Sequence, residues 1–381
     1  MSSVSVLAVA APPAPGVGRV VVEAGYYVGL AVAVGVGSTV AWLAPAESTG
    51  GVVAGRVRRL GVPAAILVAV TTLLEFFSEV ARAEKTGFRA AFGRAVVERY
   101  LHAPATRGSS VGAGAVASTQ LGACLALVLA LLATAVWGAR AWGWAVVLFG
   151  IVTVGVPAVT FGPVHTASTV RAVLTVAHLA GALVWAGGLL VLAFAGLMGR
   201  FGAGDSSGRV AEDWGRIWVR FGSVALGVVG VLVVSGSWLA WTHVGTPAQL
   251  FTTPYGRYLA IKLALVVVML GAGGYNARVL LPGIEAARAS GDQAGLFRVA
   301  VRHFPKVVAV EAVLAVGVLF VVPFLAGSAR SEAGWPAARS FDLTVFGTGV
   351  VLAVIVAGVL WAGTRTGPRG SADAREAVRA A

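Results

Sequence analysis

Sulfur-containing side chains and charges are scarce in this chain of 381 residues. Its single cysteine, Cys124, excludes both an internal disulfide and a cluster of cysteine metal ligands. Three methionines, of which Met198 and Met269 fall in long apolar runs, are too few for a methionine ladder that would carry cuprous ions. Charged residues make up 12% of the chain, whereas soluble domains contain about 25%. A soluble globular protein is therefore excluded.

Apolar residues dominate instead, at 58% of the chain, and the mean hydropathy is +0.87. A helix needs about 20 apolar residues to cross a bilayer. Runs of that length occur at 20–44, 60–81, 114–137, 141–162, 171–198, 217–242, 257–280, 304–326 and 342–363. The pattern predicts an all-α, polytopic membrane helix bundle of about nine transmembrane helices.

The formal net charge of +13 is unevenly distributed among the loops. Arginine and lysine gather in the loops after the first, fifth and seventh runs and in the C-terminal tail, all of which share one side under nine crossings. Basic loops mark the cytoplasmic side and face anionic lipid. We therefore expect a multi-pass membrane protein with an outer N-terminus, a cytoplasmic C-terminus and no nucleic-acid partner.

One basic loop, residues 82–113, would then face outward. Within it, basic and apolar residues alternate at helical spacing in the stretch GFRAAFGRAVVERYLH. This pattern predicts an amphipathic helix near 87–102 that lies on the outer surface. If that prediction is wrong, the first two spans are inverted or miscounted.

The first eight runs resemble two parallel four-helix repeats. YYVGLAVAVG, from Tyr26, aligns with HLAGALVWAG, from His178, and STQLGACLALVLA, from Ser118, aligns with TTPYGRYLAIKLA, from Thr252. Four spans per unit give both halves the same orientation, as in a parallel repeat. The predicted division is an outward tail (1–19), a first repeat (20–165), a second repeat (166–328), an additional ninth helix (340–364) and a cytoplasmic tail (365–381).

Three histidines are candidate metal ligands. His178 shares a helical face with Gly181 and Trp185, which suggests that this face meets protein rather than lipid. His165 and His243 end the fourth and sixth runs on the outer side, where they would form the mouth above His178. Imidazole suits copper, zinc, nickel and iron. His165, His178 and His243 therefore predict a metal path, although each alone is more often a surface or helix-linking residue.

Charges inside the apolar runs are expensive and tend to serve function. Glu75 and Lys262 fall near one level of the outer third, so they are expected to neutralise each other. Glu311, in the eighth run, has Arg220 and Arg278 as candidate partners. Both sets allow two interpretations, a structural ion pair or a proton relay.

The second half resembles the bacterial copper resistance protein D family. The motifs are H-x-x-G-x-x-x-W-x-G-G from His178, RFGSVAL from Arg220, T-P-Y-G-x-x-L-x-x-K from Thr253, the stretch Tyr275-Asn276-Ala277-Arg278, and V-x-x-E ending at Glu311. The resemblance implies an inner-membrane protein of copper homeostasis and resistance that moves copper inward from the outer side.

The first interpretation is accordingly a copper-handling membrane protein without enzymatic activity, with copper as its ion and an extracytoplasmic copper chaperone as a candidate partner. The P-loop of ATP-binding proteins is missing, so movement would depend on a gradient or a partner. Two alternatives remain open: a b-type haem or redox membrane protein, and a non-transporting assembly factor for copper enzymes.

Overall fold

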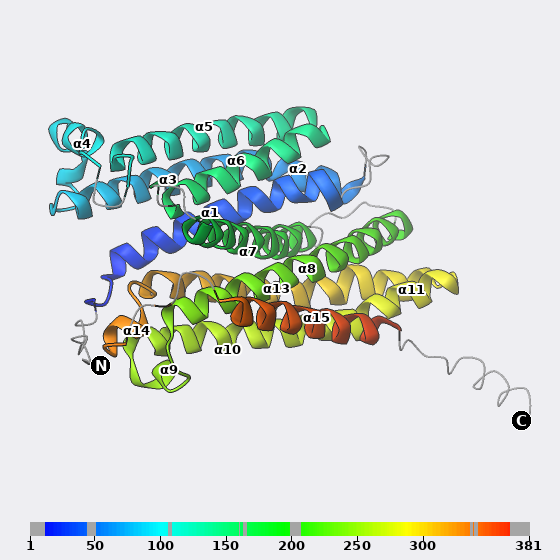
Figure 1. Ribbon diagram of the computed structural model, residues 1–381. Helices are drawn as coiled ribbons and strands as arrows, with labels where there is room; N and C mark the ends of the chain where they lie inside the picture. Colours follow the sequence, from blue (N-terminus) through cyan, green and yellow to red (C-terminus); the bar gives the residue numbers. More distant parts are fainter. Residues whose placement is uncertain are drawn as a thin grey trace, which may run out of the picture.

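The computed structural model describes residues 12–365 except 44–50, 106–108, 160, 163–165, 199–206, 336–337 and 339–341. The described residues are almost entirely helical and contain no strand, which confirms the predicted all-α bundle (Figure 1).

The first half consists of α1 (Val17–Ser38), α2 (Val52–Arg59), α3 (Gly61–Ala83), α4 (Arg94–Leu101), α5 (Ala113–Trp137) and α6 (Arg140–Ala158). The second half consists of α7 (Thr166–Met198), α8 (Ser207–His243), α9 (Gln249–Thr252), α10 (Pro254–Tyr275), α11 (Leu281–Ala289), α12 (Gln293–Phe297), α13 (Phe304–Val321) and α14 (Ala329–Glu332). The last helix is α15 (Leu343–Arg365).

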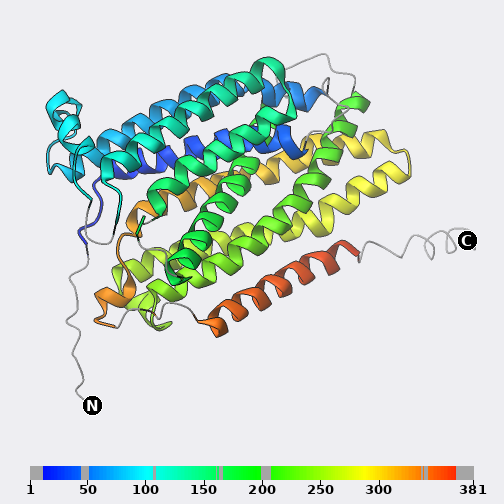
Figure 2. The ribbon, with the colours of Figure 1, turned by 45° about the horizontal axis from the view of Figure 1, so that its top comes forward.

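Eight helical segments are long and apolar enough to cross a membrane, and they cover the first eight predicted runs. They are 17–43, 52–83, 113–137, 140–158, 168–198, 208–243, 254–289 and 293–324. The ninth run forms α15, whose described apolar part is shorter, Leu343–Gly358. The long helices run side by side, and α15 lies along α8 (Figures 1 and 2).

Several helix ends follow directly from the sequence. Gly138 ends α5 in a left-handed conformation (φ 64°), which glycine adopts without steric cost. Thr253 caps α10 by accepting a hydrogen bond from the Gly256 amide, and Pro254 occupies the first turn of the helix. At the other end α10 passes into a π-helical turn, η3 (Asn276–Leu280), before α11 begins.

The predicted surface helix is shorter than the expected 87–102. The segment forms a 3₁₀ turn, η2 (Ala90–Phe92), and then α4 (Arg94–Leu101), separated by Gly93 in an extended conformation. Glycine interrupts the helical pattern because it has low helix propensity. α4 lies at the end of the bundle where α1 begins, together with α9 and α14, whereas α2 and α11 lie at the opposite end (Figure 1).

The two halves meet where α1 crosses α7. Gly35 and Gly187 are so close that a Cβ on either one would overlap the backbone of the other helix. These two glycines are the last residues of the aligned segments YYVGLAVAVG and HLAGALVWAG. A parallel repeat places equivalent residues together on its pseudo-two-fold axis. We therefore retain the division into two repeats as a proposal.

Helix packing differs between the halves at one place. α1 packs on α3 and α6, and α7 packs on α8 and α13 in the corresponding way. In the first half α5 also packs closely on both α3 and α6. In the second half α10 packs on α13 but makes few or no close contacts with α8. The separation of α8 from α10 opens the second half beside α13.

Candidate functional site

His178 lies where α7 packs on α8. Its Nδ1 is 3.1 Å from Oγ of Ser235, whose hydroxyl donates to the carbonyl of Val231 at 2.6 Å. The Ser235 oxygen is therefore placed to accept a hydrogen from Nδ1, which favours the tautomer that leaves Nε2 as the electron-pair donor. Gly236 leaves room for the ring, since a Cβ there would lie 3.3 Å from Cε1 of His178. Lys262 interacts electrostatically with the same ring.

His243 is the last residue of α8. Its Nδ1 is 2.8 Å from the carbonyl oxygen of Leu239, and its ring is stacked on Tyr255 with a centroid distance of 5.6 Å. Ser235, the partner of His178, is eight residues earlier on α8, which corresponds to about 12 Å along the helix. His178 and His243 therefore occupy successive levels rather than one centre.

His165 falls outside the described residues, so its relation to the other two histidines stays a prediction. Across the residues that the structure does describe, no group of three or more histidine, cysteine, aspartate or glutamate side chains is placed to hold a metal ion. A metal site formed by the described residues would therefore have to include ligands other than these four types of side chain.

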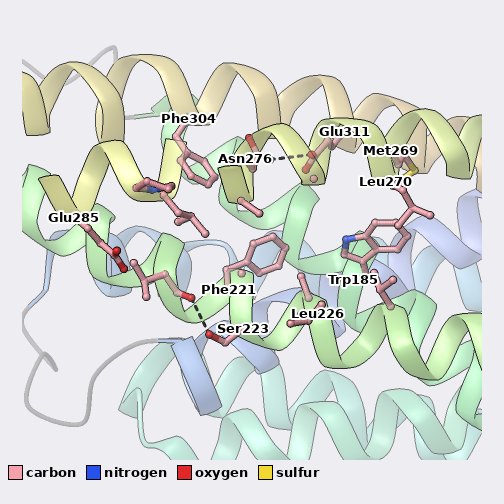
Figure 3. Close-up of a pocket in the computed structure, with 18 residues that line it drawn as sticks. Trp185, Phe221, Ser223, Leu226, Met269, Leu270, Asn276, Glu285, Phe304 and Glu311 are labelled. Atoms are coloured by element: carbon pink, nitrogen blue, oxygen red, sulfur yellow. Dashed lines mark hydrogen bonds between the residues drawn. The ribbon is translucent and has the colours of Figure 1, made fainter. Parts of the chain in front are cut away.

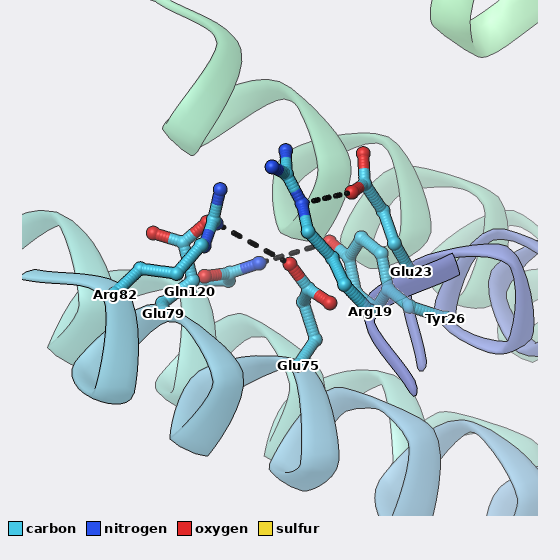
Figure 4. A network of polar contacts seen from close by, with 7 residues as sticks. All are labelled: Arg19, Glu23, Tyr26, Glu75, Glu79, Arg82 and Gln120. Atoms are coloured by element: carbon cyan, nitrogen blue, oxygen red, sulfur yellow. Dashed lines mark hydrogen bonds and ion pairs between the residues drawn. The ribbon is translucent and has the colours of Figure 1, made fainter. Parts of the chain in front are cut away.

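Glu75 belongs to a polar network in the first half (Figure 4). Its carboxylate lies 3.8 Å from the guanidinium of Arg82, which also pairs with Glu79. The expected pairing of Glu75 with Lys262 is therefore replaced by one with Arg82. The reason is lateral position: α3 packs on α1 and α5, whereas Lys262 is on α10, which packs on α13. Equal depth does not place two residues side by side.

Tyr26 extends the same network toward α5 and α6. Its hydroxyl accepts from Nε2 of Gln120 at 2.9 Å (Figure 4). The same hydroxyl donates to the carbonyl of Thr153 at 3.1 Å. Tyr26 aligns with His178 in the proposed repeat. The first half thus has a hydrogen-bonded phenol where the second half has an imidazole.

Glu311 is buried on α13 and has an amide rather than an arginine as its partner. Nδ2 of Asn276 donates to its carboxylate at 2.9 Å. Arg220, the expected counter-charge, instead lies 3.4 Å from the carbonyl oxygen of Leu43, where the first half ends its first span. Among the ion pairs of the described residues, none includes Glu311.

A cavity of about 300 Å³ lies between α8, α10 and α13, and Glu311 and Asn276 form part of its wall (Figure 3). Trp185 of α7, Phe221 of α8 and Met269 of α10 also line it, as does Glu285 of α11. Trp185 is two turns along the same face of α7 from His178. One face of α7 therefore carries both His178 and a residue of the cavity wall.

Sequence reasoning did not identify Asn276, Met269 or the aromatic walls as site residues. An amide inside an otherwise apolar span was a detectable signal, because buried polar groups require partners. The wall of the cavity was not detectable, since it results from the separation of α8 from α10.

Residues 215–325 match the family model described as copper resistance protein D. The match covers less than a third of the chain, from the first part of α8 to the end of α13 and the turn η5 (Val322–Phe324), and it confirms the resemblance found from the motifs there. No curated protein and no solved structure matches the chain. The segment that matches contains every helix of the cavity wall except α7.

Proposed function

We propose that this protein moves copper ions across the bacterial plasma membrane from the outer side. The observation that carries the proposal is the coincidence of two features in residues 215–325. This segment matches the copper resistance protein D model, and its three long helices enclose the cavity next to α7. A half-buried imidazole, a buried carboxylate and a cavity all lie in one half of the bundle, and ionisable groups at membrane depth are costly and tend to serve function.

In this proposal copper reaches His178 from the outer end of the second half. His243, the last residue of α8, and His165, which lies outside the described residues, are the proposed first ligands, and a copper chaperone on that side would deliver the ion to them. His178 offers Nε2 as a donor because Ser235 holds Nδ1. Glu75 and Arg82 compensate charge within the first half, on α3, which packs on α1 and α5 rather than on the helices of the proposed path.

The first prediction is that uptake of radioactive copper into proteoliposomes depends on His178. The His178→Ala variant should lose most uptake, because Ser235 and Lys262 offer no imidazole in its place. His102→Ala is the matched control, since His102 is an exposed histidine at the end of α4. Its uptake should equal that of the parent. Equal uptake by the parent and His178→Ala would refute the role of this residue.

Two other outcomes would replace the proposal rather than adjust it. If the parent takes up no copper, and a deletion strain supplies its copper oxidases poorly while cellular uptake is unchanged, the protein is an assembly factor. If the purified protein shows the visible absorption band of a haem, it is a b-type redox protein.

A further inference from the structure

The cavity between α8, α10 and α13 contains three different electron-pair donors. Met269 and Asn276 are seven residues apart, so they share one face of α10, with Gly273 between them on that face. A Cβ at Gly273 would meet no atom within 4 Å, so this position leaves the space open. Glu311 faces Asn276 from α13. A thioether, a carboxylate and an amide oxygen therefore line one cavity.

The amide of Asn276 is only half satisfied. Nδ2 donates to Glu311, but the buried Oδ1 has no hydrogen-bond partner among the described residues. An unpaired buried oxygen is costly, so native structures rarely keep one without a role. Asn276 is also the first residue of the π-helical turn η3, and π turns within helices frequently occur at functional sites.

The cavity contains an acidic side chain, Glu311, whereas a basic side chain of α10, Lys262, lies at another level of the bundle. Lys262 lies on α10 seven residues before Met269, about 10 Å along the helix, so its basic group is separated from the cavity. Glu311 contributes a carboxylate that takes part in no ion pair of the described residues, so one monovalent cation would neutralise it. A cation moving inward past His178 would therefore rest in the cavity rather than beside Lys262.

We propose that a single cuprous ion is held in this cavity by the thioether of Met269, the carboxylate of Glu311 and Oδ1 of Asn276. Thioether sulfur selects copper in the cuprous state over hard cations. The ring of Trp185, which also lines the cavity, adds an aromatic surface that attracts cations. The inference rests on the proposed copper function and assigns it an inner resting site that contains no histidine.

The second prediction tests this site by binding rather than by transport. The purified full-length protein in detergent is titrated with cuprous ion, kept reduced by ascorbate, against a coloured cuprous chelator. X-ray absorption of the loaded protein then reports the copper neighbours. Met269→Leu, which conserves side-chain volume, should remove the sulfur neighbour and weaken binding by at least about tenfold. Glu311→Gln should weaken binding by a similar factor while the sulfur neighbour remains.

Met198→Leu is the matched control, because Met198 is the other methionine in a span but lies half-exposed at the inner end of α7. It should bind copper as the parent does. Binding by Met269→Leu and Glu311→Gln that equals the parent's, or a parent without a copper–sulfur neighbour, would overturn the cavity site even if copper uptake is observed. Cavity binding without any uptake would instead refute the transport proposal and leave the site in place.

Discussion

Gly35 and Gly187 show how one missing side chain decides the packing of this bundle. Membrane helices gain little from burying apolar surface against each other, so close backbone approach and packing determine their association. A Cβ on Gly187 would lie 2.8 Å from the backbone nitrogen of Gly35, a distance that real Cβ atoms essentially never show. The two helices must separate to accept even one methyl group.

The third prediction follows from that contact. Gly35→Ala should lower the free energy of unfolding by about 1–3 kcal/mol, because the added methyl group overpacks the crossing. Thermal unfolding in detergent, followed by tryptophan fluorescence, measures the change. Gly227→Ala is the control, since a Cβ there meets no atom within 4 Å. If Gly35→Ala is as stable as Gly227→Ala, the close approach of α1 to α7 at this glycine is contradicted.

At the same scale, sequence reasoning found buried polar residues but not their partners. The polar character of Glu75, Lys262 and Glu311 could be read directly, since charges in apolar runs are conspicuous. Partners depend on which helices are neighbours, and hydropathy carries no information about lateral position. Glu75 therefore pairs with Arg82, and Glu311 accepts from Asn276.

The helices themselves were well predicted because bilayer thickness fixes their length. The eight candidate spans correspond to the first eight runs, and α8 starts ten residues before the run that predicted it, as Ser207–His243. Its first turns, which contain Arg209, Glu212 and Asp213, are too charged for a hydropathy run, yet they continue the helix. The separation of α8 from α10 was unpredictable, since both are ordinary apolar spans.

The fourth prediction concerns the sides on which the short helices lie. In a Cys124→Ser background, an Arg94→Cys variant places an exposed thiol on α4, and Ser290→Cys places one just after α11. A membrane-impermeant maleimide should label the first in intact spheroplasts and the second only after permeabilisation. The buried Cys124 makes the parent an unlabelled control. The reverse order of labelling would show that the orientation is inverted.

At the scale of the whole molecule, the two halves share a helix order and meet mainly through α1 and α7. The first half joins Tyr26 to Gln120 and Thr153 by hydrogen bonds, whereas the second opens a cavity beside Glu311. The match to the copper resistance protein D model begins and ends within the second half. We infer that the first half supports the second rather than repeating its chemistry.

The fifth prediction tests that division. Fragments 1–162 and 163–381, expressed together as separate chains, should co-purify in mild detergent through a tag on either one, because the crossing of α1 with α7 is buried. Gly35→Val in the first fragment should abolish co-purification, whereas Gly25→Val, which meets only a methyl group of Thr71, should not. Halves that insert into the membrane but fail to associate would contradict the division.

The glycine crossing also bears on ancestry. If a four-helix ancestor once associated with a second copy of itself, the same glycine would have faced its own counterpart across the two-fold axis. Fusion of the two genes would have freed each unit from that symmetry, so one copy could keep tyrosine where the other acquired histidine. The modern chain would then be a tethered dimer whose subunits have diverged in chemistry but still touch at the point of their first contact.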